Sequence, residues 1–330
     1  MSDFDYASAE TADFTAIPII DMPDLASDAS LNSSEFVSFS TSLISAATEV
    51  GFFYLRNHGI SEELRQQAMA ASRRFFALPE DVKQKIAVNS DQRGWMAEGG
   101  AVLQGSETYD AKEIFFWGWE SKDMDTSLPL VAPNQWPEGE ASFLKAELMA
   151  YYHAVLGLSK VVLAGLAAGL DKPADFFTPF YLNPLGRGQL VYYPPSTSAD
   201  RAARRFGAAA HADFGVLTIL FQDNLGGLQV RNRSGDWIEA PPVDNSFVCN
   251  IGDMLSYWTG GRLASTIHRV INRTDQARFS IPIFCDPSSD TVIDPAVFAE
   301  SAQAECGPAV QAGQFIQSRN QRNFTHYQKA

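Results

Sequence analysis

The sequence predicts an α+β fold that is mainly β, with a jelly-roll (double-stranded β-helix) core and supporting helices on its N-terminal and C-terminal sides. Two observations lead to this class. Helical periodicity dominates the first half of the chain, whereas residues 188–286 consist of short apolar runs separated by turn sequences such as NLGG, RSGD and TGGR. Short strands at that spacing are typical of an antiparallel sandwich or small barrel, because parallel strands would need helices between them.

We expect one continuous structure with three regions, since no internal repeat divides the chain. Residues 1–14 are predicted to form a flexible N-terminal arm and residues 15–140 a region of helices and strands. Residues 141–330 are expected to hold a long helix, the jelly-roll core and a C-terminal helix.

Apolar residues at helical spacing predict the helices that surround the core. They are expected over residues 33–50, 61–78, 79–86 and 141–171, with a last helix over 312–328. The runs IPIID and GFFYLRNHGI, at 17–21 and 51–60, are predicted to be strands. Residues 91–140 have weak periodicity, so we expect an irregular pocket wall or lid there.

Charge and cysteine content exclude several classes of function. The 330 residues carry 25 Lys and Arg against 39 Asp and Glu, a net charge of −14, and there is no long basic run. This argues against partners such as nucleic acid or an anionic membrane. The three cysteines show no CxxC spacing, so neither a disulfide framework nor a thiolate zinc site is predicted. There is no signal pattern, and no apolar run is expected to approach the roughly 20 residues that a membrane span needs, so we predict a cytoplasmic protein. We expect it to act on a small molecule and to need no obligate protein partner.

The stretch HADFGVLTILFQD, residues 211–223, reads as a buried strand with two polar residues at its entrance. Side chains two positions apart on a strand point to one face, so His211 and Asp213 are expected to project together. His268, in STIHRV, is a third candidate on another strand. Two imidazoles and one carboxylate form the facial triad typical of non-haem Fe(II) oxygenases. An H-x-D pair by itself is weak evidence, because it also occurs where no metal binds.

A second polar pattern lies in the strand ARFSIPIFCD, residues 277–286. With a period of two, Arg278, Ser280, Phe284 and Asp286 share one face. An arginine in an apolar strand needs an anionic partner, and its guanidinium fits a carboxylate bidentately. That partner is either a bound carboxylate or an Asp or Glu of the chain itself.

These motifs resemble those of the isopenicillin N synthase-like Fe(II)/2-oxoglutarate-dependent dioxygenases. The resemblance extends to NIGDML and TGGRLASTIHRV, which lie between them, and to RFFALPEDVKQKI and YDAKEIFFWG in the first half of the chain. The resemblance covers residues 15–328. It implies an enzyme that uses Fe(II), 2-oxoglutarate and O2, with ascorbate as an optional reductant. Such an enzyme oxidises a small organic molecule by hydroxylation, desaturation or ring chemistry, and releases succinate and CO2.

The resemblance also implies roles for individual residues. The positions that match the family's catalytic metal ligands are His211, Asp213 and His268. Those that match the cosubstrate site are Arg278, Ser280 and Tyr193. Positions that contact substrate in some relatives, or belong to an aromatic cluster near the pocket, are Phe284, Asp286 and Phe116. Val191 stands where many relatives carry an asparagine, which puts one polar contact near the cosubstrate in doubt.

Two other functions remain open from the sequence. Isopenicillin N synthase and aminocyclopropane carboxylate oxidase share the fold and the R-x-S pair without decarboxylating 2-oxoglutarate, so a 2-oxoglutarate-independent Fe(II) oxidase is the alternative. A non-catalytic β-sandwich binding protein is a more remote one. Asn250, in NIGDML, is expected to form a turn rather than to contact a ligand.

Overall fold

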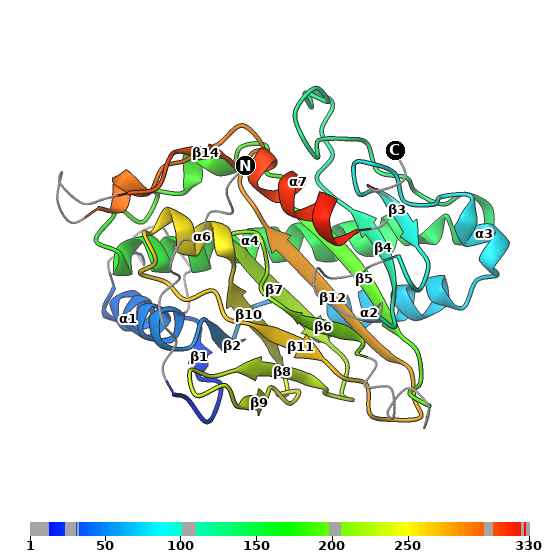
Figure 1. Ribbon diagram of the computed structural model, residues 1–330, viewed down its shortest axis with the longest axis horizontal. Coiled ribbons are helices and arrows are strands. Elements are labelled where there is room, and N and C mark those ends of the chain that lie inside the picture. The colour runs from blue at the N-terminus through cyan, green and yellow to red at the C-terminus, as the bar shows by residue number, and fades with distance from the viewer. Residues whose placement is uncertain are drawn as a thin grey trace.

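A computed structural model describes residues 13–23, 31, 33–100, 110–197, 206–299, 306–324 and 327. Nearly all of the predicted N-terminal arm therefore lies outside the described residues, as does most of the chain beyond residue 324. The rest forms two facing β-sheets with helices packed on the larger one (Figure 1).

The larger sheet joins strands from both halves of the chain, in the order β1-β2-β10-β7-β12-β5-β4-β3. Its strands are β1 (Ile19–Asp21), β2 (Phe52–Arg56), β3 (Gly94–Met96), β4 (Glu113–Trp117), β5 (Arg187–Tyr193), β7 (Leu217–Gln222), β10 (Ser246–Ile251) and β12 (Arg278–Cys285). All neighbours are antiparallel except β1 and β2. Strands β3 and β4 lie in the region that was expected to be irregular, because three to five aromatic or apolar residues give too short a pattern for a reliable prediction.

The smaller sheet has the order β6-β11-β8-β9. Its strands are β6 (Ala208–His211), β8 (Leu228–Arg231), β9 (Trp237–Glu239) and β11 (His268–Val270). A buried apolar cluster fills the space between the two sheets, with Phe52 and Val191 from the larger sheet and Val230 and Val270 from the smaller. The predicted mainly β sandwich is confirmed. A further pair of two-residue strands, β13 (Val292–Ile293) and β14 (Val310–Gln311), forms a ribbon of its own.

The helices form where the sequence predicts them, except for the short helix α6 (Asp253–Trp258), which was not predicted. They are α1 (Ser34–Glu49), α2 (Glu62–Phe76), α3 (Glu80–Gln84), α4 (Phe143–Gly169), α6 (Asp253–Trp258) and α7 (Ala312–Asn323), with short 3₁₀ turns at Gly139–Ala141, Thr178–Tyr181 and Pro295–Phe298. The Ser33 and Ser61 side chains accept hydrogen bonds from the amides of Phe36 and Leu64, which caps α1 and α2. Helices α1, α2 and α4 pack together behind the larger sheet (Figure 1).

Helix α4 corrects one expectation. The segment Gly139–Gly169 contains an 18-residue window with a mean hydropathy of 1.4, so in the described part of the chain this helix has the length and composition of a membrane span. The expectation that no apolar run reaches that length is wrong. In the structure 56% of the window is buried, with Leu148, Tyr152 and Leu163 in the core. A helix that is apolar nearly all round is typical of a buried core helix as well as of a membrane span.

Candidate active site

Three polar side chains meet where the smaller sheet faces the larger one. His211 ends β6 and His268 begins β11, and the two residues are direct partners in the antiparallel register. Asp213 follows β6 and turns back toward them. The Asp213 Oδ1 atom lies 3.9 Å from Nε2 of His211 and 3.7 Å from Nε2 of His268. These ligand atoms all lie within 4.8 Å of one another, which suits a single metal ion.

Backbone carbonyls orient both imidazoles. The Nδ1 atom of His211 lies 2.7 Å from the Ala209 oxygen, and that of His268 lies 3.2 Å from the Thr266 oxygen. A carbonyl oxygen only accepts, so each Nδ1 carries the proton and each Nε2 presents a lone pair to the centre. Burial, reinforced by the neighbouring His268, lowers the pKa of His211 to about 4, so this imidazole is neutral near pH 7.

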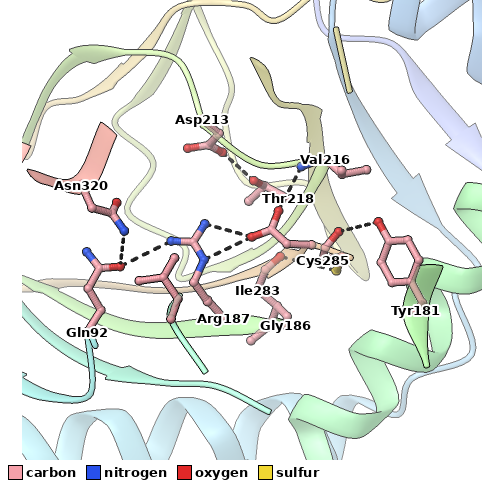
Figure 2. Close-up of polar contacts among 12 residues, drawn as sticks. Gln92, Tyr181, Gly186, Arg187, Asp213, Val216, Thr218, Ile283, Cys285 and Asn320 are labelled. Carbon is pink, nitrogen blue, oxygen red and sulfur yellow. Dashed lines mark hydrogen bonds and ion pairs between the residues drawn. The ribbon is translucent and has the colours of Figure 1, made fainter. Parts of the chain in front are cut away.

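The carboxylate of Asp213 is held on one side. Its Oδ2 atom accepts hydrogen bonds from the Thr218 hydroxyl at 2.6 Å and from the Asn250 amide at 2.8 Å, which leaves Oδ1 directed at the imidazoles (Figure 2 shows Thr218). Burial opposes ionisation, but the two histidines and these hydrogen bonds outweigh it and lower the pKa of Asp213. The residues present therefore fit a divalent metal ion with two nitrogen ligands and one oxygen ligand, the set that non-haem iron enzymes use.

Arg278 lies on β12 and is 1% exposed. Its Nε donates to the Gly226 oxygen at 2.6 Å and one terminal nitrogen, Nη2, donates to Gln222 Oε1 at 2.9 Å. The other, Nη1, is buried with no hydrogen-bond partner in the described residues. No carboxylate of the described chain pairs with this guanidinium, so the alternative of an internal ion pair is not observed there. A buried Nη1 without a partner fits a bound carboxylate.

Two adjoining cavities border the three polar residues. The Arg278 cavity lies between the sheets and is also lined by Tyr193, Ser280, Val191 and His268. The α7 cavity lies under the C-terminal helix and is also lined by Ile114, Arg187, Phe214, Asn320 and Phe324. Five residues border both cavities: Lys112, Gln189, His211, Asp213 and Phe284.

Of the three candidate substrate residues, only Phe284 lines a cavity of the site. Phe284 lines both cavities. Phe116 is 3% exposed and meets the ring of Phe324 edge-on, at 6.0 Å between centroids, so it lies behind the lining. Asp286 is fully buried: it accepts from Arg187 at 2.9 Å and from the Val216 amide at 3.0 Å.

Several residues at the site were not found from the sequence. Asn250 belongs to β10 and holds Asp213, although a turn was expected. Lys112, Gln189 and Phe214 border the cavities without a distinctive motif. Lys112 directly precedes β4 and Gln189 lies within β5, and no polar–apolar alternation around either residue singles it out.

Family models match both halves of the chain. A model described as "non-haem dioxygenase in morphine synthesis N-terminal" matches residues 17–139. The model of the 2OG-Fe(II) oxygenase superfamily matches residues 188–287, which include all three candidate ligands and Arg278.

Curated relatives match over most of their length. Homoarginine-6-hydroxylase 2-ODD-233 of Oryza sativa subsp. japonica is 34% identical over 302 residues, covering 87% of this chain and 90% of that protein. The 2-oxoglutarate-dependent dioxygenase citB of Monascus ruber is 39% identical over 264 residues, covering 76% and 79%. A 1-aminocyclopropane-1-carboxylate oxidase of Dictyostelium mucoroides is 32% identical over 316 residues, covering 85% and 84%.

A solved structure extends the similarity to three dimensions. A full-length protein of Neurospora crassa, solved in complex with alpha-KG (2-oxoglutarate) and thymine, has a TM-score of 0.82 at 25% identity, covering 95% of this chain and 98% of that one. The fold, the candidate ligands and the relatives all point to the same family. Together they favour the 2-oxoglutarate-dependent function over the 2-oxoglutarate-independent alternative. The chain belongs to the 2OG-Fe(II) oxygenase superfamily and is a 2-oxoglutarate-dependent dioxygenase, an oxidoreductase that uses iron, 2-oxoglutarate and O2.

Proposed function

We propose that His211, Asp213 and His268 hold the catalytic iron of this dioxygenase. The observation that carries this assignment is the convergence of two Nε2 atoms and one Oδ1 atom at the junction of the two cavities. Both imidazoles are held in the tautomer that a metal needs, and Asp213 is ionised. One face of the metal then stays open, since three protein ligands occupy half of an octahedron.

Arg278, Ser280 and Tyr193 are proposed to bind the distal carboxylate of 2-oxoglutarate. Arg278 and Tyr193 are partners in the β12–β5 register, and the guanidinium carbon of Arg278 lies 4.8 Å from the Tyr193 ring centroid. Ser280 projects two residues further along the same face of β12. The keto-acid end of the cosubstrate would then reach the metal centre within the Arg278 cavity.

Iron with bound 2-oxoglutarate would activate O2, so that one oxygen atom goes into succinate as CO2 leaves and the other serves to oxidise an unactivated C–H bond of the substrate. The residues of this chain position the reactants and exclude water. Apolar side chains from between the sheets line the Arg278 cavity, and the α7 cavity borders His211 and Asp213, where a second molecule would bind. Hydroxylation, desaturation and ring chemistry are the proposed outcomes.

The proposed substrate is a small organic molecule bound in the α7 cavity. The relatives named above act on, or were solved with, compounds of that size, such as homoarginine and thymine. The net charge of −14 supports a protein that binds neither nucleic acid nor an anionic membrane. We also propose a cytoplasmic location and no obligate protein partner.

An anaerobic titration tests these assignments. Fe(II) is added to the metal-free protein, then 2-oxoglutarate, and the visible metal-to-ligand charge-transfer band is recorded. The parent should give a saturating band, Asp213→Ala should bind no iron, and Arg278→Ala should need roughly 10- to 100-fold more 2-oxoglutarate because a charged hydrogen bond is lost. Arg56→Ala, at an exposed ion pair with Asp21, is the matched control and should behave as the parent. An unchanged titration of Arg278→Ala would refute the proposed anchor.

A further inference from the structure

Gln189 differs from the other residues that border both cavities. Gln189 is half-buried and its side-chain amide has no hydrogen-bond partner within the described part of the chain. It lines the same two cavities as His211 and Asp213. A glutamine amide offers two donor hydrogens and an acceptor oxygen, and these atoms are accessible from the cavities, since they are not among the fully buried unpaired atoms of the described chain. Gln189 therefore presents a donor and an acceptor to a molecule in the cavity.

The position of Gln189 along β5 assigns it to the substrate side. Arg187, Gln189, Val191 and Tyr193 alternate onto one face of this strand. Tyr193 is opposite Arg278 at the proposed cosubstrate anchor, and Gln189 lies four residues, about 13 Å, away from it. Gln189 is instead opposite Phe116 on β4, toward the α7 cavity.

The cations that line the described α7 cavity already have carboxylate partners. Lys112 Nζ lies 2.9 Å from Asp110 Oδ2, and Arg187 Nη2 lies 2.9 Å from Asp286 Oδ2. The remaining carboxylate, Asp213, is directed at the proposed metal. A charged group on the substrate would either stay unpaired in this cavity or displace a buried partner, and both are costly.

Two further polar residues line the cavity, and both amides already donate within the chain, Asn320 to Gln92 Oε1 and Asn323 to the Arg319 carbonyl. Most of the remaining lining is aromatic or aliphatic. Phe214, Phe284 and Phe324 border the α7 cavity together with Ile114. The guanidinium carbon of Arg187 lies 5.0 Å from the Phe284 ring centroid, which fixes that ring against the cavity. Aromatic walls favour a flat apolar molecule.

We propose that Gln189 is a specificity-determining residue that hydrogen-bonds the substrate. The substrate is an uncharged molecule whose flat apolar body carries an amide-like edge, with a carbonyl beside an N–H, as in a lactam or an imide. This inference rests on the proposed function, because it uses the same placement of the iron and of 2-oxoglutarate.

Anaerobic binding to the enzyme loaded with Fe(II) and 2-oxoglutarate tests the proposal. The probes are thymine and oxindole, which are an uncharged imide and lactam, with homoarginine as a cation and indole-3-acetate as an anion. Thymine or oxindole should perturb the charge-transfer band at concentrations at least tenfold lower than either charged probe. Gln189→Met should weaken that binding about tenfold and change the half-saturation by 2-oxoglutarate less than twofold. The matched control is Gln67→Met, on the exposed side of α2.

Three results would overturn the proposal: tighter binding of homoarginine or indole-3-acetate, no binding of thymine or oxindole, or a tenfold loss of 2-oxoglutarate affinity in Gln189→Met. The last would assign Gln189 to the cosubstrate. Failure of the band to form before any probe is added would count against the proposed function instead. Saturation-transfer NMR of the same probes on the metal-free protein would then compare the parent with Gln189→Met directly.

Discussion

Thr218 and Asn250 determine how Asp213 presents its carboxylate. Both donate to Oδ2, from neighbouring strands of the larger sheet, and both are buried. The remaining oxygen has its direction set before any metal binds. Hydrogen-bonding partners of metal ligands commonly contribute as much to a site as some of the ligands do, because they cut the cost of ordering it.

Thr218→Val is predicted to weaken Fe(II) binding roughly tenfold, because the carboxylate loses its shortest hydrogen bond but keeps that of Asn250. A competitive chelator titration measures the affinity. Thr259→Val, which removes a buried hydroxyl that donates to the Leu255 carbonyl, is the matched control and should leave iron affinity unchanged. Equal affinity in Thr218→Val and the parent would show that Asn250 alone positions Asp213.

At the scale of elements, the ion pair of Arg187 and Asp286 connects three strands beside the α7 cavity, which Arg187 lines. Arg187 begins β5, Asp286 follows β12, and the same carboxylate accepts from Val216 just before β7. Gln92 extends the contact, since its Oε1 accepts from Asn320 of α7 at 2.9 Å. The C-terminal helix is thus connected to the strands that line the site.

Asp286→Asn is predicted to lower the free energy of unfolding by about 3 kcal/mol, because it leaves the buried Arg187 without a charged partner. Urea denaturation of the metal-free protein measures it. Asp21→Asn breaks an exposed ion pair with Arg56 and should cost less than about 1 kcal/mol. In a double-mutant cycle with Arg187→Met, additive losses would mean that the two charges do not stabilise one another.

For the whole molecule, the larger sheet crosses the boundary between the two halves of the chain. Strand β2 from the N-terminal half pairs with β10, and β4 pairs with β5. The N-terminal half therefore completes the sheet on both sides of the strands β10, β7, β12 and β5. Such interleaving predicts a single cooperative unit rather than two independently stable parts.

Leu55→Ala, in the fully buried centre of β2, is predicted to destabilise the protein by roughly 3 kcal/mol. The urea midpoint for labelling the buried thiols of Cys249 and Cys285, in the C-terminal half, should fall together with the midpoint from circular dichroism. The exposed Cys306 gives an internal reference for reactivity, and Ile19→Ala, at an exposed position, is the matched control. Thiol midpoints that stay at the parent value would show separate unfolding of the halves.

The sequence by itself determined the class of fold, all the long helices and the family. Strand period, turn residues and helical spacing are local properties, so HADFG, STIHRV and the R-x-S strand could be read directly. The predicted proximity of His211 and Asp213 is confirmed by the 3.9 Å separation of their ligand atoms. The predicted reason is wrong, because β6 ends at His211 and Asp213 lies in the connection to β7, so the two residues do not share one strand.

Only the tertiary structure decided which polar groups are already satisfied. Asp286 shares the strand face of Arg278 in the sequence pattern, yet it is paired with Arg187, 99 residues earlier in the chain. Asn250 reaches Asp213 across 37 residues, and Gln189 has no partner among the described residues. Such pairings depend on strand register and on which elements pack together, and these follow from the burial of the whole chain rather than from any one segment.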